Sequence, residues 1–387
     1  MAKICIITEI FPNTEHKSAG IFVRDHVEIL SEQHEIDVLV IRSKRSFYIE
    51  PKTYLRENLP SSVRIIEVSY LSIPRNYAPN IVFPLLFTRL NKATDLTKYD
   101  LFYVHNALPG GGIIPFIKRN YPQSKTILMI HGSDWRDKWK RFYLKKIMVT
   151  ILNKVDHIWI SGPTLAKQVL DTSPNSKAKL ETTYNIVSPK LVNTERLQKN
   201  DARSILGWPN DSVEFICIAN IAHVKGVDIL VEALAMLNSS SWNRIHILGG
   251  VTDNGIMKRL TKRIYELGLE KKVLFVGTIP RHELITYYYA ADLYVLPSRN
   301  EGFNVSLLEA AYVGIPAVAT NCGGASLLIK NANYLPKPES ISELVKSLTL
   351  IQENLNKFDA VNHFNLDFIE KYCFFNTLLG RINSILK

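Results

Sequence analysis

Residues 293–316, LYVLPSRNEGFNVSLLEAAYVGIP, decide the fold of this chain. The first four residues are apolar, which predicts a short buried strand at 293–296. Apolar residues at helical spacing follow and predict a helix over about residues 304–312. Gly314 is placed to cap the C-terminus of that helix, and Pro316 follows its end. The stretch is therefore a strand, a loop and a helix, the unit from which parallel sheets are built.

The loop between this strand and this helix predicts a site for a long anionic ligand. Gly302 allows a sharp turn, so the amides of Phe303 and Asn304 lie at a helix N-terminus, where N–H groups and the helix dipole attract anions. Glu301 lies on the loop and Glu309 lies two turns inside the helix, so their carboxylates can bind separate parts of one ligand, such as sugar hydroxyls. Taken alone, such a pair more often means one solvated glutamate and one glutamate in an ion pair.

Short apolar runs alternate with helical periodicity along the 387 residues, a length that suggests two domains. Strands are expected at 3–7, 36–41, 62–69, 101–104, 126–130, 157–160, 214–219, 244–248, 273–276, 293–296 and 317–319. Helices are expected at 21–32, 82–97, 138–152, 226–237, 256–267 and 281–290. This alternation predicts an α/β protein with two Rossmann-like, doubly wound parallel sheets. A polar stretch from Asn185 to Asp211 separates them, and we expect domains at 1–190 and 191–365, with a ligand cleft between them.

The composition is that of a folded globular protein. Apolar residues make up 46% and charged residues 21%, which excludes wholesale disorder, collagen and coiled coil. The four cysteines are scattered without a Cys-x-x-Cys pair, which argues against disulfides and zinc sites. No run approaches the ~18 apolar residues of a spanning helix, and the N-terminal apolar run is too short for a signal peptide. We therefore expect a cytoplasmic protein.

The positive charge is concentrated in the first half of the chain. The formal net charge is +11, and residues 1–190 hold 27 Lys and Arg against 17 Asp and Glu, a net of +10. Basic and aromatic residues are mixed at 42–48 and at 135–146, a combination that suits an anionic membrane surface. We expect the first domain to dock peripherally at the inner face of the membrane. A solvated helix with its aromatics in the core, and a charge excess due to chance, are the alternatives, and no nucleic-acid-binding module is recognisable.

The spacing Glu-x7-Glu from Glu301 to Glu309, with the loop between, resembles the motif of the retaining GT-B glycosyltransferases of family 4, the group 1 glycosyl transferases. The resemblance is strong over residues 214–325 and weaker over 1–190. It implies the GT-B fold, in which two Rossmann-like domains face a central cleft. It also implies that the last segment, 366–387, forms a helix that packs back on the first domain.

The resemblance assigns roles in the second domain. It implies that Glu301 touches the sugar of a nucleotide-sugar donor, that Glu309 binds the ribose, and that the amides of residues 302–304 meet the sugar and diphosphate. Lys225, within ANIAHVKGVD at 219–228, stands where the family has a lysine that neutralises the leaving diphosphate.

Two further pairs of residues in this domain bear on the donor. The backbone at Gly277 and Thr278 corresponds to the part of the family that contacts the base. Asn220 stands where the family usually has a phosphate-binding arginine, and Arg299 is a candidate substitute.

In the first domain the resemblance places Gly20 in a donor-contacting loop and His131, at the end of a strand, beside the donor sugar. His105 and Asn106 follow another strand and are candidates for the acceptor side. We thus expect His131, Lys225 and Glu301 to be the catalytic residues.

The expected function is transfer of a sugar, with retention of configuration, from a UDP- or GDP-sugar to a glycan or lipid-linked glycan acceptor in surface polysaccharide or glycoconjugate biosynthesis. No Asp-x-Asp occurs, so we expect neither a metal nor another cofactor. A nucleotide-sugar epimerase or hydrolase of the same fold is one alternative. A catalytically inactive sugar-nucleotide-binding relative is another, because Asn220 departs from the family pattern.

Overall fold

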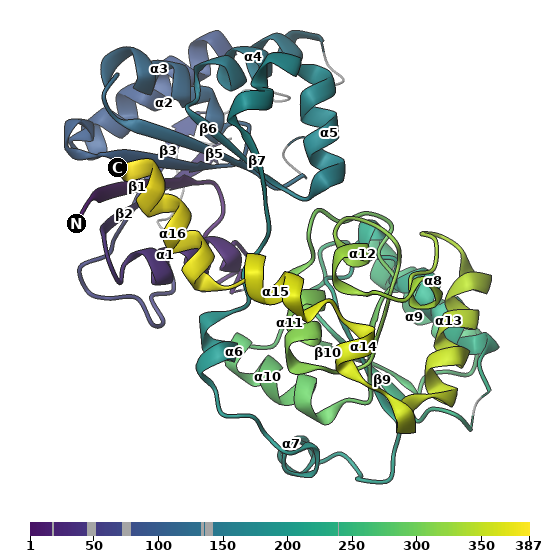
Figure 1. The fold of residues 1–387 in the computed structure, drawn as a ribbon. Helices are drawn as coiled ribbons and strands as arrows, with labels where there is room; N and C mark the ends of the chain where they lie inside the picture. Colours follow the sequence, from purple (N-terminus) through teal and green to yellow (C-terminus); the bar gives the residue numbers. More distant parts are fainter. Residues whose placement is uncertain (18, 45–51, 72–78, 133–134, 136–141, 239) are drawn as a thin grey trace. The chain divides into compact units, whose positions relative to one another are not determined.

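The computed structural model describes all residues of the chain except 18, 45–51, 72–78, 133–134, 136–141 and 239. The chain divides into two compact units (Figure 1). Unit 1 consists of Met1–Tyr184 and Phe375–Lys387, and unit 2 of Asn185–Phe374. The boundaries between the units therefore lie at 184/185 and 374/375, whereas the sequence predicted domain boundaries at 190/191 and 365/366.

Unit 1 contains a parallel sheet of seven strands in the order β3-β2-β1-β4-β5-β6-β7. The strands are β1 (Lys3–Thr8), β2 (Glu35–Lys44), β3 (Arg64–Leu71), β4 (Leu101–His105), β5 (Lys125–Ile130), β6 (His157–Ser161) and β7 (Leu180–Thr183). The first six confirm the predicted strands. The edge strand β7 was missed because its sequence, LETT, is short, mostly polar and incompletely buried, so it carries no apolar run.

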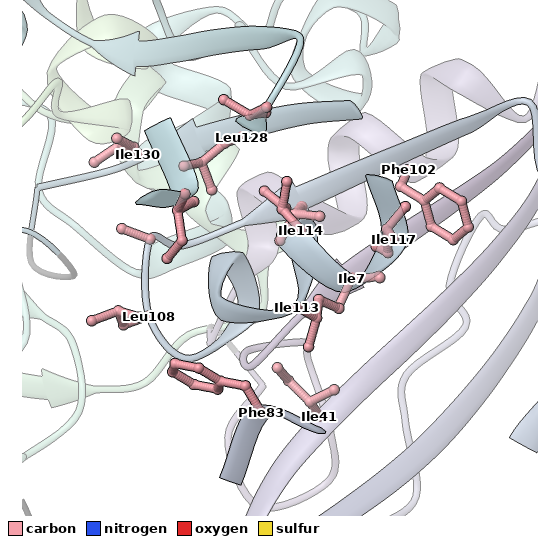
Figure 2. Packing of buried hydrophobic residues seen from close by; sticks show 14 of the residues in the cluster. Ile7, Ile41, Phe83, Phe102, Leu108, Ile113, Ile114, Ile117, Leu128 and Ile130 are labelled. Atoms are coloured by element: carbon pink, nitrogen blue, oxygen red, sulfur yellow. The ribbon is translucent and has the colours of Figure 1, made fainter. Parts of the chain in front are cut away.

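Several helices of unit 1 pack around an apolar core. The helices of this unit are α1 (Ile21–Leu30), α2 (Pro79–Ala93), α3 (Ile114–Asn120), α4 (Phe142–Lys154), α5 (Pro163–Thr172) and α16 (Phe375–Leu386), with the short 3-10 helices η2 (Leu96–Lys98), η3 (Gly110–Ile113) and η4 (Pro174–Lys179). Figure 2 shows strand side chains such as Ile7 and Phe102 packed with Ile113 and Ile117. Strands covered on both faces read as continuous apolar runs, which is why the sequence revealed them. Residues 138–141 of the expected helix 138–152 lie outside the described residues.

The end of the chain forms two helices with a break between them. Helix α15 (Leu366–Tyr372) belongs to unit 2, and α16 belongs to unit 1. Within unit 1, Asn383 Nδ2 donates to Gln33 Oε1 at 3.0 Å, and Arg381 Nε lies 3.3 Å from Glu181 Oε1. The helix α16 also contacts α1.

Unit 2 contains a parallel sheet of five strands in the order β10-β9-β8-β11-β12. Its strands are β8 (Glu214–Ile218), β9 (Arg244–Leu248), β10 (Val273–Gly277), β11 (Leu293–Leu296) and β12 (Ala317–Ala319), all as predicted within a residue. The chain runs from β8 outward to β10 and then returns to the other side of β8 as β11. This change of direction makes the carboxyl ends of β8 and β11 a topological switch point, the place where open parallel sheets bind ligands.

Besides α15, the α-helices of unit 2 are α6 (Pro189–Asn193), α7 (Lys199–Leu206), α8 (Val227–Met236), α9 (Asn254–Glu266), α10 (Arg281–Ala290), α11 (Val305–Val313), α12 (Ala325–Leu328), α13 (Ile341–Glu353) and α14 (Ala360–His363). Among them, α8, α9, α10 and α11 correspond to the predicted helices 226–237, 256–267, 281–290 and 304–312. The 3-10 helices are η5 (His223–Lys225), η6 (Ala332–Tyr334) and η7 (Leu355–Lys357). Helix α7 lies inside the polar stretch 185–211, and only tertiary contacts hold it to the sheet.

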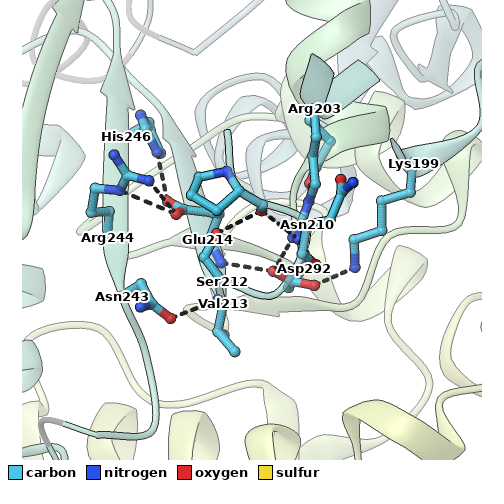
Figure 3. A network of polar contacts seen from close by, with 12 residues as sticks. Lys199, Arg203, Asn210, Ser212, Val213, Glu214, Asn243, Arg244, His246 and Asp292 are labelled. Atoms are coloured by element: carbon cyan, nitrogen blue, oxygen red, sulfur yellow. Dashed lines mark hydrogen bonds and ion pairs between the residues drawn. The ribbon is translucent and has the colours of Figure 1, made fainter. Parts of the chain in front are cut away.

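A polar network at the amino ends of the strands makes those contacts (Figure 3). Glu214, fully buried at the start of β8, accepts from Arg244 Nη2 at 2.9 Å and lies 2.8 Å from His246 Nε2. Asp292 pairs with Arg203 of α7 at 2.6 Å and accepts from the backbone N–H of Glu214 at 2.7 Å. Because this network lies at the opposite edge of the sheet from the carboxyl ends of β8 and β11, we assign it a structural role.

Candidate functional site

Two loops meet in direct backbone contact at the carboxyl edge of the unit 2 sheet. Gly226, in the loop between β8 and α8, has φ 66°, and a Cβ there would lie 2.0 Å from the carbonyl oxygen of Pro297. The N–H of Arg299 donates to the carbonyl of Val224 at 2.8 Å. Only glycine fits this contact, so the sequence Lys-Gly at 225–226 places Lys225 against the loop that follows β11.

Arg299 holds these two loops together. Its guanidinium donates to both oxygens of Asp228 at 2.8 and 2.7 Å, to Glu339 Oε1 at 3.0 Å and to the carbonyl of His223 at 2.7 Å. Burial by itself raises the pKa of Asp228, but the hydrogen bonds and charge of Arg299 bring it below its ordinary value. Four donors of Arg299 are therefore occupied by protein groups. This arrangement argues against Arg299 as the substitute phosphate ligand and makes it a clamp between loops.

Asn220 joins two other loops of this edge. Its side-chain oxygen Oδ1 accepts from the N–H of Gly250 at 2.9 Å, just after β9. The residue is exposed, and an amide in place of a guanidinium brings no positive charge to a phosphate. A phosphate contact by Asn220 remains a prediction.

Lys225 and Glu301 form the central pair of the site. Lys225 Nζ lies 2.7 Å from Glu301 Oε1, and Ser298 Oγ donates to the same oxygen at 2.6 Å, as does Asn304 Nδ2 at 3.2 Å. The two charged side chains are 24% and 11% exposed, so solvent reaches them only in part. Among the described residues no hydrogen bond ends on the other oxygen, Oε2. Glu301 is thus fixed through one oxygen and can accept from a ligand through the other.

The loop from Gly302 to Asn304 has the predicted form. Asn304 is the N-cap of α11, and its Oδ1 accepts from the N–H of Leu307 at 2.9 Å. The helix begins at Val305, and Gly314 with φ 85° ends it. Within the described part of the chain, the amides of Gly302 and Asn304 donate no hydrogen bond. They are therefore donors for an anion at this helix N-terminus.

The side chain of Phe303 is buried within unit 2. Its side chain is 5% exposed, and a Cβ on Gly324 would lie 2.2 Å from the Phe303 ring. Asn185 Nδ2 donates to the carbonyl oxygen of Phe303 at 2.6 Å. The predicted contact between this residue and a donor accordingly concerns its amide and not its ring.

Glu309 is almost completely buried, and protein groups hold both of its oxygens. It is 6% exposed, and Arg281 Nη2 pairs with Oε1. The single proton of the Tyr288 hydroxyl is shared between Oε2 of Glu309 and the carbonyl oxygen of Ser306, each at 3.0 Å. Burial and the charge of Glu309 keep the pKa of Tyr288 well above its usual value, so the phenol stays a donor. The sequence did not identify Arg281 or Tyr288. A buried carboxylate signals that a partner is needed, but not which residue supplies it.

The loops after β9 and β10 lie side by side. The N–H of Gly249 donates to the carbonyl of Gly277 at 2.8 Å, and a Cβ on Gly250 would lie 2.9 Å from Thr278 Oγ1. Gly277 has φ 86°, a conformation that favours glycine. The structure thus brings Asn220, Lys225, Gly277, Thr278, Glu301 to Asn304 and Glu309 to one edge of the unit 2 sheet.

In unit 1, histidines gather at the carboxyl ends of β4 and β5. Nδ1 of His105 lies 3.0 Å from Nε2 of His131, and the two rings are stacked at 5.3 Å. His26 of α1, which the sequence did not identify, lies with its ring 5.7 Å from that of His105 and hydrogen-bonds the Tyr103 hydroxyl at 3.0 Å. Burial lowers the pKa of His26 and of His131 to about 3, and that of His105 well below its usual range. The cluster is therefore neutral at pH 7.

Gly20 and Asn106 flank this cluster. Gly20 caps the N-terminus of α1 with φ 69°, and a Cβ there would lie 2.4 Å from the carbonyl oxygen of Ile10. Phe22, two residues further on, has its ring 4.5 Å from that of His131. Asn106 adopts φ 74°, which is uncommon for a residue other than glycine and is typical of functional sites. Unit 1 therefore brings together Gly20, His105, Asn106 and His131.

The basic-aromatic stretches are described only in part, because 45–51 and 136–141 lie outside the described residues. Trp135 is fully buried in the core of unit 1, which agrees with the alternative that aromatics of this stretch are core residues. Arg42 pairs with Glu67 at 2.9 Å. No helix among the residues searched has the length and apolar character needed to span a membrane. In that same set, no cluster of three His, Cys, Asp or Glu has the arrangement of a metal site.

Two family models match the chain one after the other. The model described as Glycosyltransferase Family 4 matches residues 19–191, and the model described as Glycosyl transferases group 1 matches residues 198–361. The chain belongs to this glycosyltransferase family. The residues at the edge of the unit 2 sheet all lie inside the second match, and those of the histidine cluster lie inside the first.

This family 4 glycosyltransferase is similar to proteins of known name over most of its length. The putative teichuronic acid biosynthesis glycosyltransferase TuaC of Bacillus subtilis is 25% identical over 90% of this chain and 88% of its own. Among solved structures, sucrose-phosphate synthase from Thermosynechococcus elongatus matches with a TM-score of 0.78 and 19% identity, covering 100% of this chain and 98% of that one. Anabaena HepE in complex with UDP-glucose matches with a TM-score of 0.77 and 16% identity, covering 100% and 99%. These likenesses confirm the GT-B fold.

Proposed function

We propose that this chain is a retaining glycosyltransferase that moves a sugar from a nucleotide sugar to a glycan or lipid-linked glycan acceptor in surface polysaccharide or glycoconjugate biosynthesis. The observation that carries the proposal is the Lys225–Glu301 pair, 2.7 Å apart in the loops that follow β8 and β11. The name of TuaC refers to teichuronic acid biosynthesis, and HepE was solved in complex with UDP-glucose. The first supports a biosynthetic glycosyltransferase, and the second supports a UDP-sugar donor.

The bond that breaks joins the anomeric carbon of the sugar to an oxygen of the diphosphate. Negative charge then grows on the diphosphate, and Lys225 with the amides at 302–304 would stabilise it. The ammonium of Lys225 contacts Glu301 in this structure, so the diphosphate would share it. Oε2 of Glu301 would accept from a hydroxyl of the donor sugar and orient the ring. Because an ammonium and a helix N-terminus supply positive charge, the proposed reaction needs no metal or cofactor.

The acceptor oxygen would attack the anomeric carbon from the face that the diphosphate leaves, and the acceptor proton would pass to the departing phosphate oxygen. This front-face course retains the configuration without a covalent intermediate. His131, neutral at pH 7, would form a hydrogen bond to the donor sugar and bring no charge to it. His105 and Asn106 would lie toward the acceptor.

A panel of nucleotide sugars tests the donor. Thermal shift with UDP- and GDP-sugars should show stabilisation by one of them, because a ligand that binds the native state raises the unfolding temperature. Release of the free nucleotide should then depend on the acceptor. Release at the same rate without any acceptor would favour a hydrolase. Binding without release would favour an inactive relative, for which the Asn220 departure is the supporting observation.

We also propose that the first domain docks on an anionic membrane surface at the inner face of the membrane. The supporting observation is the net charge of +10 in residues 1–190. Flotation with phosphatidylglycerol vesicles should carry the protein upward at low salt and release it at high salt. Equal recovery with neutral vesicles would contradict this part of the proposal.

A further inference from the structure

Helix α10 presents two donors to one carboxylate of α11. Arg281 is the first residue of α10 and Tyr288 is the eighth, and residues seven apart lie on the same face of a helix. Arg281 Nη2 pairs with Oε1 of Glu309. The hydroxyl of Tyr288 lies 3.0 Å from Oε2 and shares its single proton between this oxygen and the carbonyl of Ser306, also at 3.0 Å. The side chains of Arg281 and Glu309 are 8% and 7% exposed. The carboxylate plane is thus fixed from both ends.

The Glu309 carboxylate, held in this way, can still accept hydrogen bonds from two neighbouring hydroxyl groups of a ligand. An ionised carboxylate has about four lone-pair positions, two on each oxygen. Arg281 and Tyr288 use one position on each oxygen. Among the described residues no other group donates to this carboxylate, so one position on Oε1 and one on Oε2 remain. Two neighbouring ribose hydroxyls require the same number of acceptor positions.

Arg281 supplies the positive charge that pairs with the buried Glu309 carboxylate. A buried charge needs such a partner, so removal of Arg281 should disturb the position of the carboxylate. Arg281 also follows directly after the loop of Gly277 and Thr278, for which we propose contact with the base. Its position is therefore between the proposed base and ribose contacts along the chain.

We propose that Arg281 and Tyr288 are positioning residues that hold the Glu309 carboxylate for the 2′- and 3′-hydroxyls of the donor nucleotide, and so set the preference for ribonucleotide over deoxyribonucleotide. This inference rests on the proposed function, in which Glu309 binds the ribose. In this proposal Arg281 acts by holding Glu309 and does not itself contact the nucleotide.

Calorimetric titration with UDP and with 2′-deoxy-UDP tests the inference, with GDP and 2′-deoxy-GDP used if the panel selects a GDP-sugar. In the unaltered protein the deoxynucleotide should bind about tenfold to a hundredfold more weakly, as expected for the loss of a hydrogen bond to a charged group. The quantity to compare is the ratio of the Kd for the deoxynucleotide to the Kd for the ribonucleotide. In Arg281→Gln this ratio should fall to about two, mostly through weaker binding of UDP. Arg281→Lys, which keeps the charge but loses the planar fork, should recover part of the ratio.

Two further variants separate positioning from folding. Tyr288→Phe removes one hydroxyl and keeps the ring, and it should lower the ratio about threefold to tenfold, since a neutral donor contributes less than a charged one. Arg263→Gln is the matched control, because Arg263 also pairs with a glutamate, Glu232, at 2.6 Å, but does not touch Glu309. Its ratio should equal that of the unaltered protein.

The outcomes are distinct. A deoxynucleotide penalty that persists unchanged in both Arg281→Gln and Tyr288→Phe overturns the inference and leaves the proposed function standing. A protein that binds none of these nucleotides overturns both. A collapse of the ratio in these two variants, with Arg263→Gln unchanged, supports the inference.

Discussion

Replacement of Lys225 by alanine should reduce turnover far more than stability. Two unit charges 4 Å apart interact by about 4 kcal/mol at an effective dielectric of 20, which corresponds to about a 10³-fold change in rate. Lys225 is 24% exposed and already paired with Glu301, so part of this energy is screened or shared. We therefore expect kcat of Lys225→Ala to fall by about 10²- to 10³-fold.

The same substitution should leave the fold intact. Glu301 keeps its hydrogen bonds from Ser298 and Asn304, and loss of a partly exposed ion pair costs about 1 kcal/mol or less. The assay is release of the free nucleotide from the donor at saturating acceptor, with the unfolding temperature measured on the same preparation. Lys262→Ala is the control, because Lys262 also contacts a glutamate, Glu266, but on the surface of α9. A kcat of Lys225→Ala within tenfold of the unaltered protein would refute the assignment of Lys225 to the leaving group.

Three further results are expected. Glu309→Gln should raise the Kd for UDP by about tenfold or more in calorimetry and change kcat at saturating donor little, because it weakens charged hydrogen bonds to the ribose. Gly226→Ala should lower the free energy of unfolding by at least about 2 kcal/mol, since its Cβ would meet a carbonyl oxygen at 2.0 Å. Gly207→Ala is its control, with φ 66° but nothing within 4 Å, and should cost only about 1 kcal/mol of strain. Burial lowers the pKa of His26 and His131 to about 3, so between pH 3 and 6.5 these side chains are neutral in the folded protein and charged in the unfolded protein. The unfolded state therefore binds more protons in this range. The free energy of unfolding should be greatest above pH 6.5 and fall as the pH drops toward 3. Calorimetric melting over pH 4–8 checks this, and a transition temperature that is flat down to pH 4 would contradict it.

The local pattern of the chain predicted most of the fold, and its failures have physical causes. Buried parallel strands such as β8 and β11 carry continuous apolar runs, so they were found almost to the residue. Strand β7 and helix α7 were missed because they are polar over much of their surface and depend on neighbours. Helix α7 is held to the sheet by Arg203 and its pairing with Asp292, 89 residues away in sequence.

The candidate site divides in the same way. Asn304 was expected at the start of α11 and caps it, because the side chain bonds an amide only three residues away. Arg299 was expected near a phosphate and instead holds Asp228, 71 residues distant in the chain. Arg281 and Tyr288 were not expected at all, although they hold both oxygens of Glu309.

The sequence by itself determined the α/β class, the strand–loop–helix at 293–316 and the positions of its two glutamates, because periodicity, caps and glycine turns are properties of near neighbours in the chain. Only the tertiary structure decided which charges meet. The order of the strands brings the loop of Lys225 beside that of Glu301, and the packing of α10 against α11 brings Arg281 to Glu309. The energies of such pairs depend on distance and burial, which the chain acquires only when its sheets and helices pack.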